Sequence, residues 1–418
     1  MILETLRTSS LKMKEHRGPP EELLARVESL LHDLRVTPPF DISFTDSLGI
    51  PVHLTVRTPA LEHVSFDTLK EWGEFRLSYT HQGTGLTSVQ SRLSCLMEAI
   101  ERFSAGHHPL EGRLITATCR ELEPEAVDPR IFYLPPGTDF SCHRPLVWYR
   151  GVDILSNEPV CVPVDLVLID LPDSAYPFDG FETHRLGFFF SNGLAAGATR
   201  SEALIAAILE VIERDSQHRL DIGTAPQPVE LALKDDHLLG PWVELFHCHR
   251  LSLRAFFTCR IPGIYSAVAT SWDEYCRILV MGTAADTDIR AAVHRAIMEL
   301  IQQRAYMFFK TWKTRRQYLP IVRYIRDRIP PSSYATHPPA SFWTEQAFTP
   351  IALDDAGASC PRDLGHLLSA ICRDHRIIAF DLTHPDLGIP VVRVLIEGMQ
   401  NGYLHYQQAL AFVEEQPS

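Results

Sequence analysis

The sequence contains neither a Cys-x-x-Cys pair nor an apolar run long enough to cross a membrane. Its nine cysteines are scattered and odd in number, which argues against a disulfide framework or a zinc ribbon and favours reduced thiols in a cytoplasmic protein. The apolar stretch at 162–171 is interrupted by Asp165 and Asp170, so it is too short and too charged to span a membrane. The N-terminus has no apolar segment typical of a signal peptide.

The usual phosphate-binding loops are absent as well, since the chain has no GxxxxGK[ST] and no GxGxxG motif. A basic excess is also missing: 39 Lys and Arg stand against 52 Asp and Glu, giving a formal net charge of −13. This balance argues against a nucleic-acid partner. It still permits ATP, because Mg²⁺ can join carboxylates to phosphates.

The 418 residues are 45% hydrophobic, which excludes disorder of the whole chain. Helical and extended patterns alternate without a clean linker, so we expect an α+β fold: one large domain of mixed β-sheets flanked by helices. We place an N-terminal helical segment at 1–45 and the large domain at 46–418. The periodicity predicts helices over 20–36, 86–105, 200–214 and 289–310, strands within 47–57, 146–170, 254–281, 376–382 and 389–396, and a loop at 315–341.

Two internal repeats stand out. The string Leu-Gly-Ile-Pro-Val occurs at 48–52 and again at 387–391, which we interpret as a turn that leads into a strand. The pattern Glu-x-x-Glu/Gln occurs on three predicted helices, and its first two copies are followed directly by Arg. In these two copies the first glutamate stands thirteen residues after a glycine (85 to 98, 197 to 210).

Residues three or four apart share one face of a helix, so each copy forms a polar stripe beside an apolar one. The stripe residues, with their polar neighbours, are Ser94, Glu98, Glu101 and Arg102; Glu202, Glu210, Glu213 and Arg214; and Arg295, Glu299, Gln302 and Arg304. Stacked carboxylates repel one another and require compensation by arginines or a divalent cation. Each helix alone is compatible with a solvated face; the repetition favours a shared polar site.

Glycine-rich turns at 81–87 and 191–199 precede the first two stripes. Such turns expose backbone N–H groups at a helix N-terminus, where an anion can bind. The alternative is an ordinary helix-capping turn, and the sequence leaves both open.

These segments resemble the YcaO family. The resemblance lies in NGLAAGATRSEALIAAILEVIERD, GTGLTSVQSRLSCLMEAIERFSA and HPDLGIPVVRV, and the early segment HRGPPEELLARVESLLHDL is similar to the stand-alone, TfuA-associated branch. It covers about residues 15 to 400. It implies a YcaO-type domain that activates a peptide backbone amide with ATP and Mg²⁺, giving a thioamide, an azoline or an amidine in a ribosomally made peptide or protein.

The resemblance further implies that all twelve stripe residues bind the ATP cofactor, with Glu98, Glu101, Glu210 and Glu213 as ligands of Mg²⁺. It implies a TfuA-like or leader-peptide-binding partner protein and leaves room for a homodimer. No single residue is assigned as catalytic.

The chain departs from the family pattern at several positions. Thr84 stands where Lys is usual in the first turn, and Ala198 where Asn is usual in the second. The Gly-x-Arg-Asp-Asp run is absent, the usual Pro-Gly-Leu-Glu reads Glu-Gly-Met-Gln at 397–400, and the chain lacks a proline-alternating tail. These departures support an alternative in which the chain is a non-catalytic partner or scaffold of a peptide-modifying complex.

Overall fold

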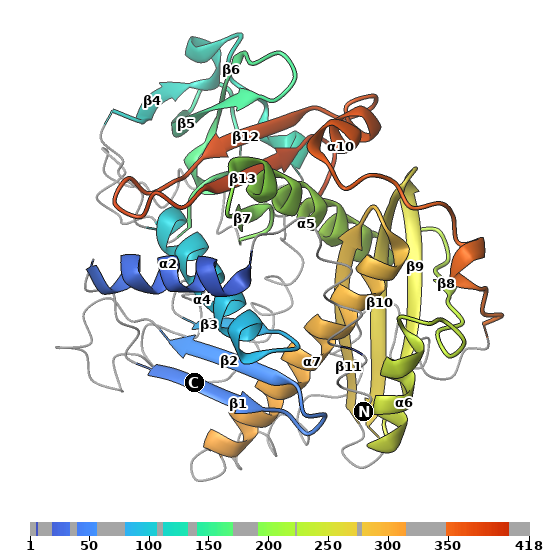
Figure 1. The fold of residues 1–418 in the computed structure, drawn as a ribbon. Helices are drawn as coiled ribbons and strands as arrows, with labels where there is room; N and C mark the ends of the chain where they lie inside the picture. Colours follow the sequence, from blue (N-terminus) through green and yellow to red (C-terminus); the bar gives the residue numbers. More distant parts are fainter. Residues whose placement is uncertain are drawn as a thin grey trace, which may run out of the picture.

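The computed structural model describes residue 6 and residues 19–33, 40–56, 80–106, 112–132, 140–169, 191–221, 224–273, 278–314 and 348–400. The loop predicted at 315–341 lies outside these residues. Three antiparallel sheets and the helices between them confirm the predicted α+β class (Figure 1).

The first sheet has the order β1 (Phe40–Thr45), β2 (Pro51–Val56), β3 (Thr80–Thr84). The second has the order β11 (Ile278–Asp286), β10 (Ile264–Asp273), β9 (Arg254–Ile261), β8 (Val229–Glu230). The third has the order β4 (Leu114–Thr118), β5 (Pro145–Asp153), β12 (Ile377–Asp381), β13 (Val391–Ile396), β7 (Leu194–Ala196), and β6 (Pro159–Pro163) pairs with β5. The predicted boundary at 45/46 falls inside the β1–β2 hairpin.

The strand predicted at 47–57 begins later, at Pro51, because residues 46–50 form a turn. The Asp46 carboxylate accepts the backbone N–H groups of Leu48 and Ile50, and Gly49 has a φ of 80°, a conformation that favours glycine. Gly388, at the same position of the second Leu-Gly-Ile-Pro-Val string, has a φ of 60°. The repeated string therefore does encode a turn that leads into a strand.

One unit occurs three times: a strand at the end of its sheet, a short turn and a long helix. β3 leads into α4 (Ser88–Gly106), β7 into α5 (Arg200–Asp221), and β11 into α7 (Ile289–Thr314). The three helices match the predicted ones, although α5 continues seven residues beyond the predicted end at 214.

Each of these helices connects two sheets (Figure 1). α4 packs on β2 and β3 and reaches β7 and β13, α5 packs on β7 and β13 and reaches β10 and β11, and α7 packs on β10 and β11 and reaches β3. The ring of contacts closes, so the three sheet ends β3, β7 and β11 face one another across the helices.

Glycines let these helices approach their strands closely. A Cβ atom at Gly83 would lie 2.2 Å from the carbonyl oxygen of Ser91, and one at Gly282 would lie 2.2 Å from that of Ala296. Any larger residue at either position would push the helix away from its strand.

The remaining helices lie outside this ring. α2 (Pro20–Asp33) packs on α4, α10 (Leu364–Ile371) packs on α5, and α6 (Gly240–Cys248) adds Trp242 and Phe246 to the core of the four-stranded sheet. Short 3₁₀ helices lie at Cys119–Leu122, Pro129–Phe132, Val164–Leu166 and Leu353–Asp355. No helix among the described residues has the length and apolar character that a membrane crossing requires.

Candidate active site

The three long helices begin with the same kind of cap. The Thr87 hydroxyl accepts the N–H of Gln90 on α4, the Thr199 hydroxyl accepts that of Glu202 on α5, and the Asp288 carboxylate accepts that of Ala291 on α7. The two glycine turns therefore end in capping threonines, which is the second of the two interpretations left open by the sequence.

From each cap the first glutamate of the repeat stands eleven residues on (87 to 98, 199 to 210, 288 to 299). Eleven residues are close to three turns of a helix. Glu98, Glu210 and Glu299 consequently occupy equivalent positions, three turns into helices that each start at the end of a sheet.

Three glutamates bind backbone N–H groups of the strands at the sheet ends. Glu98 accepts an N–H of β3 over 2.6 Å, and Glu299 accepts an N–H of β11 over 3.1 Å. Burial raises the pKa of Glu101, and a hydrogen bond from a backbone N–H of β7 partly opposes this rise. The donors are, in the same order, Gln82, Thr283 and Ala196. These contacts fix carboxylates of α4 and α7 where the sheet ends meet.

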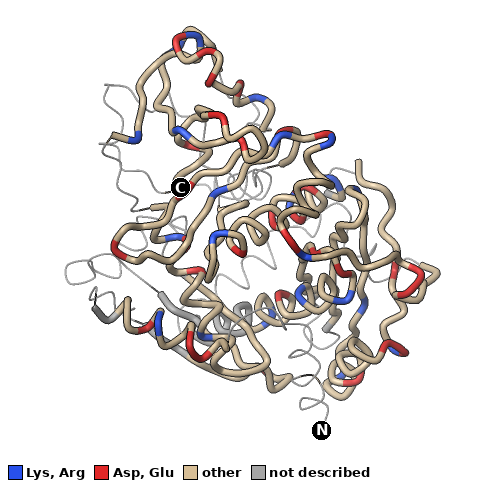
Figure 2. The backbone as a smooth tube through the Cα atoms, turned by 45° about the horizontal axis from the view of Figure 1, so that its top comes forward, with Lys and Arg blue, Asp and Glu red and all other residues tan. Residues whose placement is uncertain are grey.

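Two arginines of the repeat neutralise part of this charge. The Arg102 guanidinium lies 2.5 Å from Glu98, and that of Arg214 lies 3.6 Å from Glu213 and 3.7 Å from Glu299. Arg214 thus links α5 to α7. Acidic and basic residues lie side by side along the helices at the centre of the molecule (Figure 2).

Burial dominates the electrostatics of the site. It raises the pKa of Glu210 and of Glu299 to about 7; the charge of Arg214 opposes this rise, and the charge of Glu213 adds to it. Burial also raises the pKa of Glu101 well above its ordinary value, and the nearby charges of Glu210 and Glu98 add to that rise. These three carboxylates are thus held in a buried place where ionisation is unfavourable without further positive charge.

Sequence reasoning missed Arg393, which the structure places at the same site. Its side chain is only 1% exposed. Burial lowers its pKa to about 10, while Glu210 and Glu101 act in the opposite direction. The only signal in the sequence is one charged residue in the otherwise apolar strand β13.

The structure thus brings together seven predicted residues: Glu98, Glu101, Arg102, Glu210, Glu213, Arg214 and Glu299. Four others have different partners. Glu202 accepts the N–H of Ala198, the residue before the capping Thr199, Arg295 lies 3.3 Å from Asp286, Gln302 lies 3.4 Å from the Thr84 hydroxyl, and Arg304 donates to Ser47. Ser94 is exposed on α4.

The cluster fits a divalent cation bound together with phosphate. Its five carboxylates exceed its three guanidinium groups by two charges when all are ionised, and all its acidic ligands are oxygens, as Mg²⁺ prefers. Among the described residues, no three Asp, Glu, His or Cys side chains converge closely enough to hold a metal by themselves. One or two carboxylates completed by phosphate oxygens is the usual arrangement for Mg²⁺.

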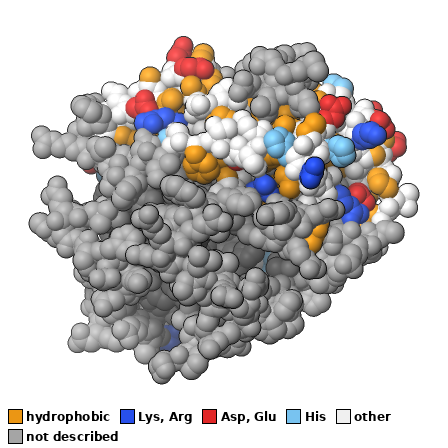
Figure 3. Space-filling model, turned by 90° about the horizontal axis from the view of Figure 1, so that it is seen from below, with side chains coloured by type: hydrophobic (Ala, Val, Ile, Leu, Met, Phe, Trp, Pro, Cys, Tyr) orange, Lys and Arg blue, Asp and Glu red, His pale blue; other side chains and the backbone are white. Residues whose placement is uncertain are grey.

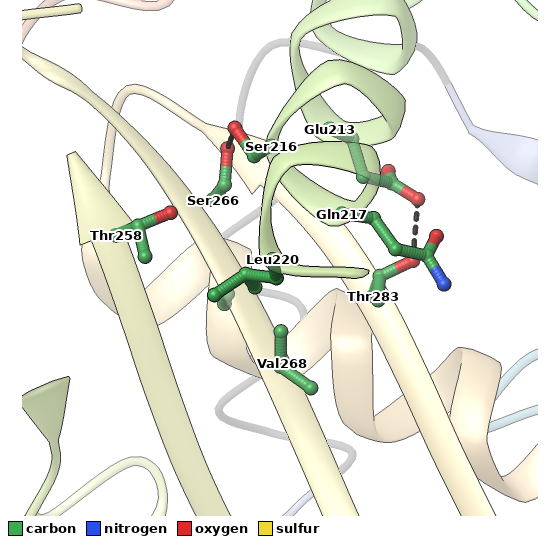
Figure 4. Close-up of a pocket in the computed structure, with 9 residues that line it drawn as sticks. Glu213, Ser216, Gln217, Leu220, Thr258, Ser266, Val268 and Thr283 are labelled. Atoms are coloured by element: carbon green, nitrogen blue, oxygen red, sulfur yellow. Dashed lines mark hydrogen bonds between the residues drawn. The ribbon is translucent and has the colours of Figure 1, made fainter. Parts of the chain in front are cut away.

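A small pocket lies beside Glu213, between α5 and strands β9–β11 (Figure 4). Its lining mixes hydroxyl groups with apolar side chains: Thr283 donates to Glu213 over 2.7 Å, and the hydroxyl groups of Ser216 and Ser266 are 2.9 Å apart. Leu220 lines it from α5.

Comparison with known proteins decides the family. Residues 82–400 match the family model described as YcaO cyclodehydratase, ATP- and Mg²⁺-binding. The chain belongs to the YcaO family. ATP and Mg²⁺ are thus the cofactors of its family, as the sequence predicted.

The chain is similar to a solved YcaO structure from Methanopyrus kandleri bound with AMPPCP and Mg²⁺, with 25% identity, a TM-score of 0.64 and 93% of each chain covered. A heterocyclase in complex with substrate and cofactor shares the fold at 19% identity and a TM-score of 0.68, over 97% of this chain and 57% of that one.

Two uncharacterised proteins are also similar to this YcaO chain. One, from Methanothermobacter thermautotrophicus, is 28% identical over 91% of this chain and 94% of its own length. The other, from Rhizobium leguminosarum bv. trifolii, is described as lying in the tfuA 3′ region and is 24% identical over 91% of this chain and 87% of its own length.

Proposed function

We propose that this YcaO protein uses ATP and Mg²⁺ to activate a backbone amide of a ribosomally made peptide or protein, which then becomes a thioamide or an azoline. The observation that supports this most is the cluster of five glutamates and three arginines at the meeting point of three sheet ends. When bound, ATP with Mg²⁺ supplies the phosphoryl group that makes the amide oxygen a good leaving group.

We assign different roles to the glutamates and to the arginine of the cluster. Glu101 and Glu210, whose pKa values are raised, are the carboxylates best placed to gain from a divalent cation. Arg214, held between Glu213 and Glu299, offers a fixed positive charge that favours phosphoryl transfer. Glu98 and Glu213 already accept hydrogen bonds, and these bonds hold α4 on β3 and α5 on β11.

The thioamide is the product we favour. A similar protein lies in a tfuA 3′ region, and a TfuA-like partner is the one that the family resemblance links to thioamides. Thioamide formation replaces oxygen by sulfur, whereas azoline formation removes water. The two reactions change the mass of a peptide differently, so mass spectrometry of a candidate peptide distinguishes the two products.

The first test is ATP turnover by the full chain with Mg²⁺ and a candidate peptide, measured as release of ADP and phosphate. The variants Glu98→Gln and Glu213→Gln remove one negative charge each while keeping side-chain size. We expect both to reduce turnover by at least about tenfold, in line with loss of preorganised charge. Unchanged turnover in both variants would refute this site.

A second candidate, a non-catalytic scaffold, is favoured by Thr84. Its hydroxyl lies 3.3 Å from the Met298 carbonyl oxygen and 3.4 Å from Gln302, so this position provides no positive charge for a phosphate. Calorimetry of the full chain with AMPPCP and Mg²⁺ separates the candidates: tight binding argues against a scaffold, and absence of binding argues for one.

A further inference from the structure

Arg393 occupies an unusual position for a charged residue. It lies in the middle of β13, and all six residues of this strand are buried. Its paired neighbours across the sheet, Phe380 on β12 and Leu194 on β7, are apolar. Val391 and Leu395, two positions away on either side, belong to the apolar core. The strand itself therefore gives the guanidinium no polar environment.

Two of the three guanidinium nitrogens of Arg393, Nε and Nη1, are buried and have no hydrogen-bond partner among the described residues. No carboxylate in the described part of the chain lies within ion-pair distance of it. Strand β13, which carries Arg393, contacts both α4 and α5. Burial lowers the pKa of Arg393, and the nearby charges of Glu210 and Glu101 partly oppose this effect. Buried N–H groups without partners are rare in native proteins and call for an explanation.

We propose that Arg393 is a phosphate-binding residue of this site, whose guanidinium donates to oxygens of a phosphate group held next to Glu101 and Glu210. The proposal rests on the proposed use of ATP. A guanidinium presents two planar forks of parallel N–H groups, Nε with Nη2 and Nη1 with Nη2, and each fork matches two phosphate oxygens. A bound phosphate would therefore give at least one of the two buried donors an acceptor, and it would place the positive charge of Arg393 opposite the charge of the phosphate rather than only opposite the two glutamates.

The surface of the described residues offers no large apolar patch. Leu155 and Val229 are the large hydrophobic residues exposed in the described part of the chain. On the described part of the face shown in Figure 3, hydrophobic side chains are interspersed with polar and charged ones.

The test is calorimetric binding of AMPPCP with Mg²⁺ to the full chain, to Arg393→Met and to Arg393→Lys. We expect Arg393→Met to weaken binding at least tenfold and Arg393→Lys to weaken it less, since lysine keeps the charge but loses the fork. Arg376→Met is the matched control: Arg376 precedes the neighbouring strand β12 and pairs with Asp153 instead. We expect the control to bind as the wild type does.

Thermal unfolding without ligand distinguishes phosphate binding from a purely structural role. Since Nε and Nη1 have no hydrogen-bond partner among the described residues, replacing the guanidinium by an apolar side chain of similar length should leave the melting temperature unchanged or higher. If Arg393→Met instead melts well below wild type, the lysine variant decides: wild-type affinity in Arg393→Lys would overturn the proposal. Binding of AMPPCP by Arg393→Met within twofold of wild type would also overturn it while leaving the proposed function intact. A wild-type chain that does not bind AMPPCP with Mg²⁺ would overturn both.

Discussion

The hydroxyl group of Thr283 on β11 donates a hydrogen bond of 2.7 Å to the Glu213 carboxylate on α5. Through this bond the end of the four-stranded sheet holds a helix that packs mainly on the six-stranded one. Because Glu213 is only 7% exposed, water cannot readily replace the hydroxyl. The contact therefore fixes the position of α5 and of the carboxylates on the same face of this helix.

Thr283→Val should lower the free energy of unfolding by about 1.5–3 kcal/mol, the usual cost of losing a hydrogen bond to a charged group. Urea denaturation followed by circular dichroism measures this directly. Thr283→Ser, which keeps the hydroxyl group, is the matched control and should lose markedly less. A loss in Thr283→Val that does not exceed the loss in Thr283→Ser would contradict the stabilising role of this hydrogen bond.

The pKa values of Glu210 and Glu299, raised to about 7, predict how stability changes with pH. Between about pH 4.5 and 7 the folded chain holds these protons more tightly than the unfolded chain does, so their contribution to stability is lost as pH rises through 7. We expect the metal-free protein to melt at a lower temperature at pH 8 than at pH 6. A melting temperature that rises over this range at constant ionic strength would contradict the raised pKa values.

Gly282 tests the close packing of α7 on β11. In Gly282→Ala the new Cβ atom would lie 2.2 Å from a backbone oxygen of α7, so the helix must move and the free energy of unfolding should fall by about 1–3 kcal/mol or more. Gly106→Ala, at the end of α4, is the control because its nearest neighbour would lie 3.5 Å away. Its effect should stay within about 0.5 kcal/mol, and a similar loss in both variants would refute the packing argument.

Glu202 separates a capping role from cofactor binding. Its carboxylate accepts the N–H of Ala198 over 3.1 Å, and a glutamine oxygen can accept the same bond. Glu202→Gln should therefore leave both the melting temperature and the affinity for AMPPCP with Mg²⁺ close to wild type. A large loss of affinity at unchanged melting temperature would support the sequence-based prediction that Glu202 binds the cofactor and contradict a role limited to capping.

Helical periodicity is a local property, and for that reason the sequence predicted the carboxylate helices well. The predicted helix at 86–105 is α4 at Ser88–Gly106, and its stripe faces the site because three turns separate cap and glutamate. Long-range pairing is different. Arg304 stands five residues after Glu299, whereas Arg102 and Arg214 stand four after Glu98 and Glu210, and it donates to Ser47, 257 residues away, a contact that no local pattern encodes.

The site residue that sequence analysis missed has the same explanation. Arg393 reaches the glutamates only because β13 pairs with β7, so that the two strands end one sheet beside α4 and α5. Within its own strand it is one charged residue among apolar ones. The family resemblance covered the segment of Arg393 but did not distinguish this residue from its neighbours. Its buried Nε and Nη1, which have no hydrogen-bond partner among the described residues, do distinguish it.

The central claim is that the glutamates of α4 and α5 serve a nucleotide and its metal ion. The most direct measurement is calorimetric titration of AMPPCP with Mg²⁺ into wild type and Glu210→Gln, with a parallel titration without Mg²⁺. We predict Mg²⁺-dependent binding by the wild type that falls at least about tenfold in Glu210→Gln, since burial raises the pKa of Glu210 to about 7 and a nearby cation would stabilise the ionised carboxylate. Equal affinities of the two proteins, or binding that does not depend on Mg²⁺, would contradict the account.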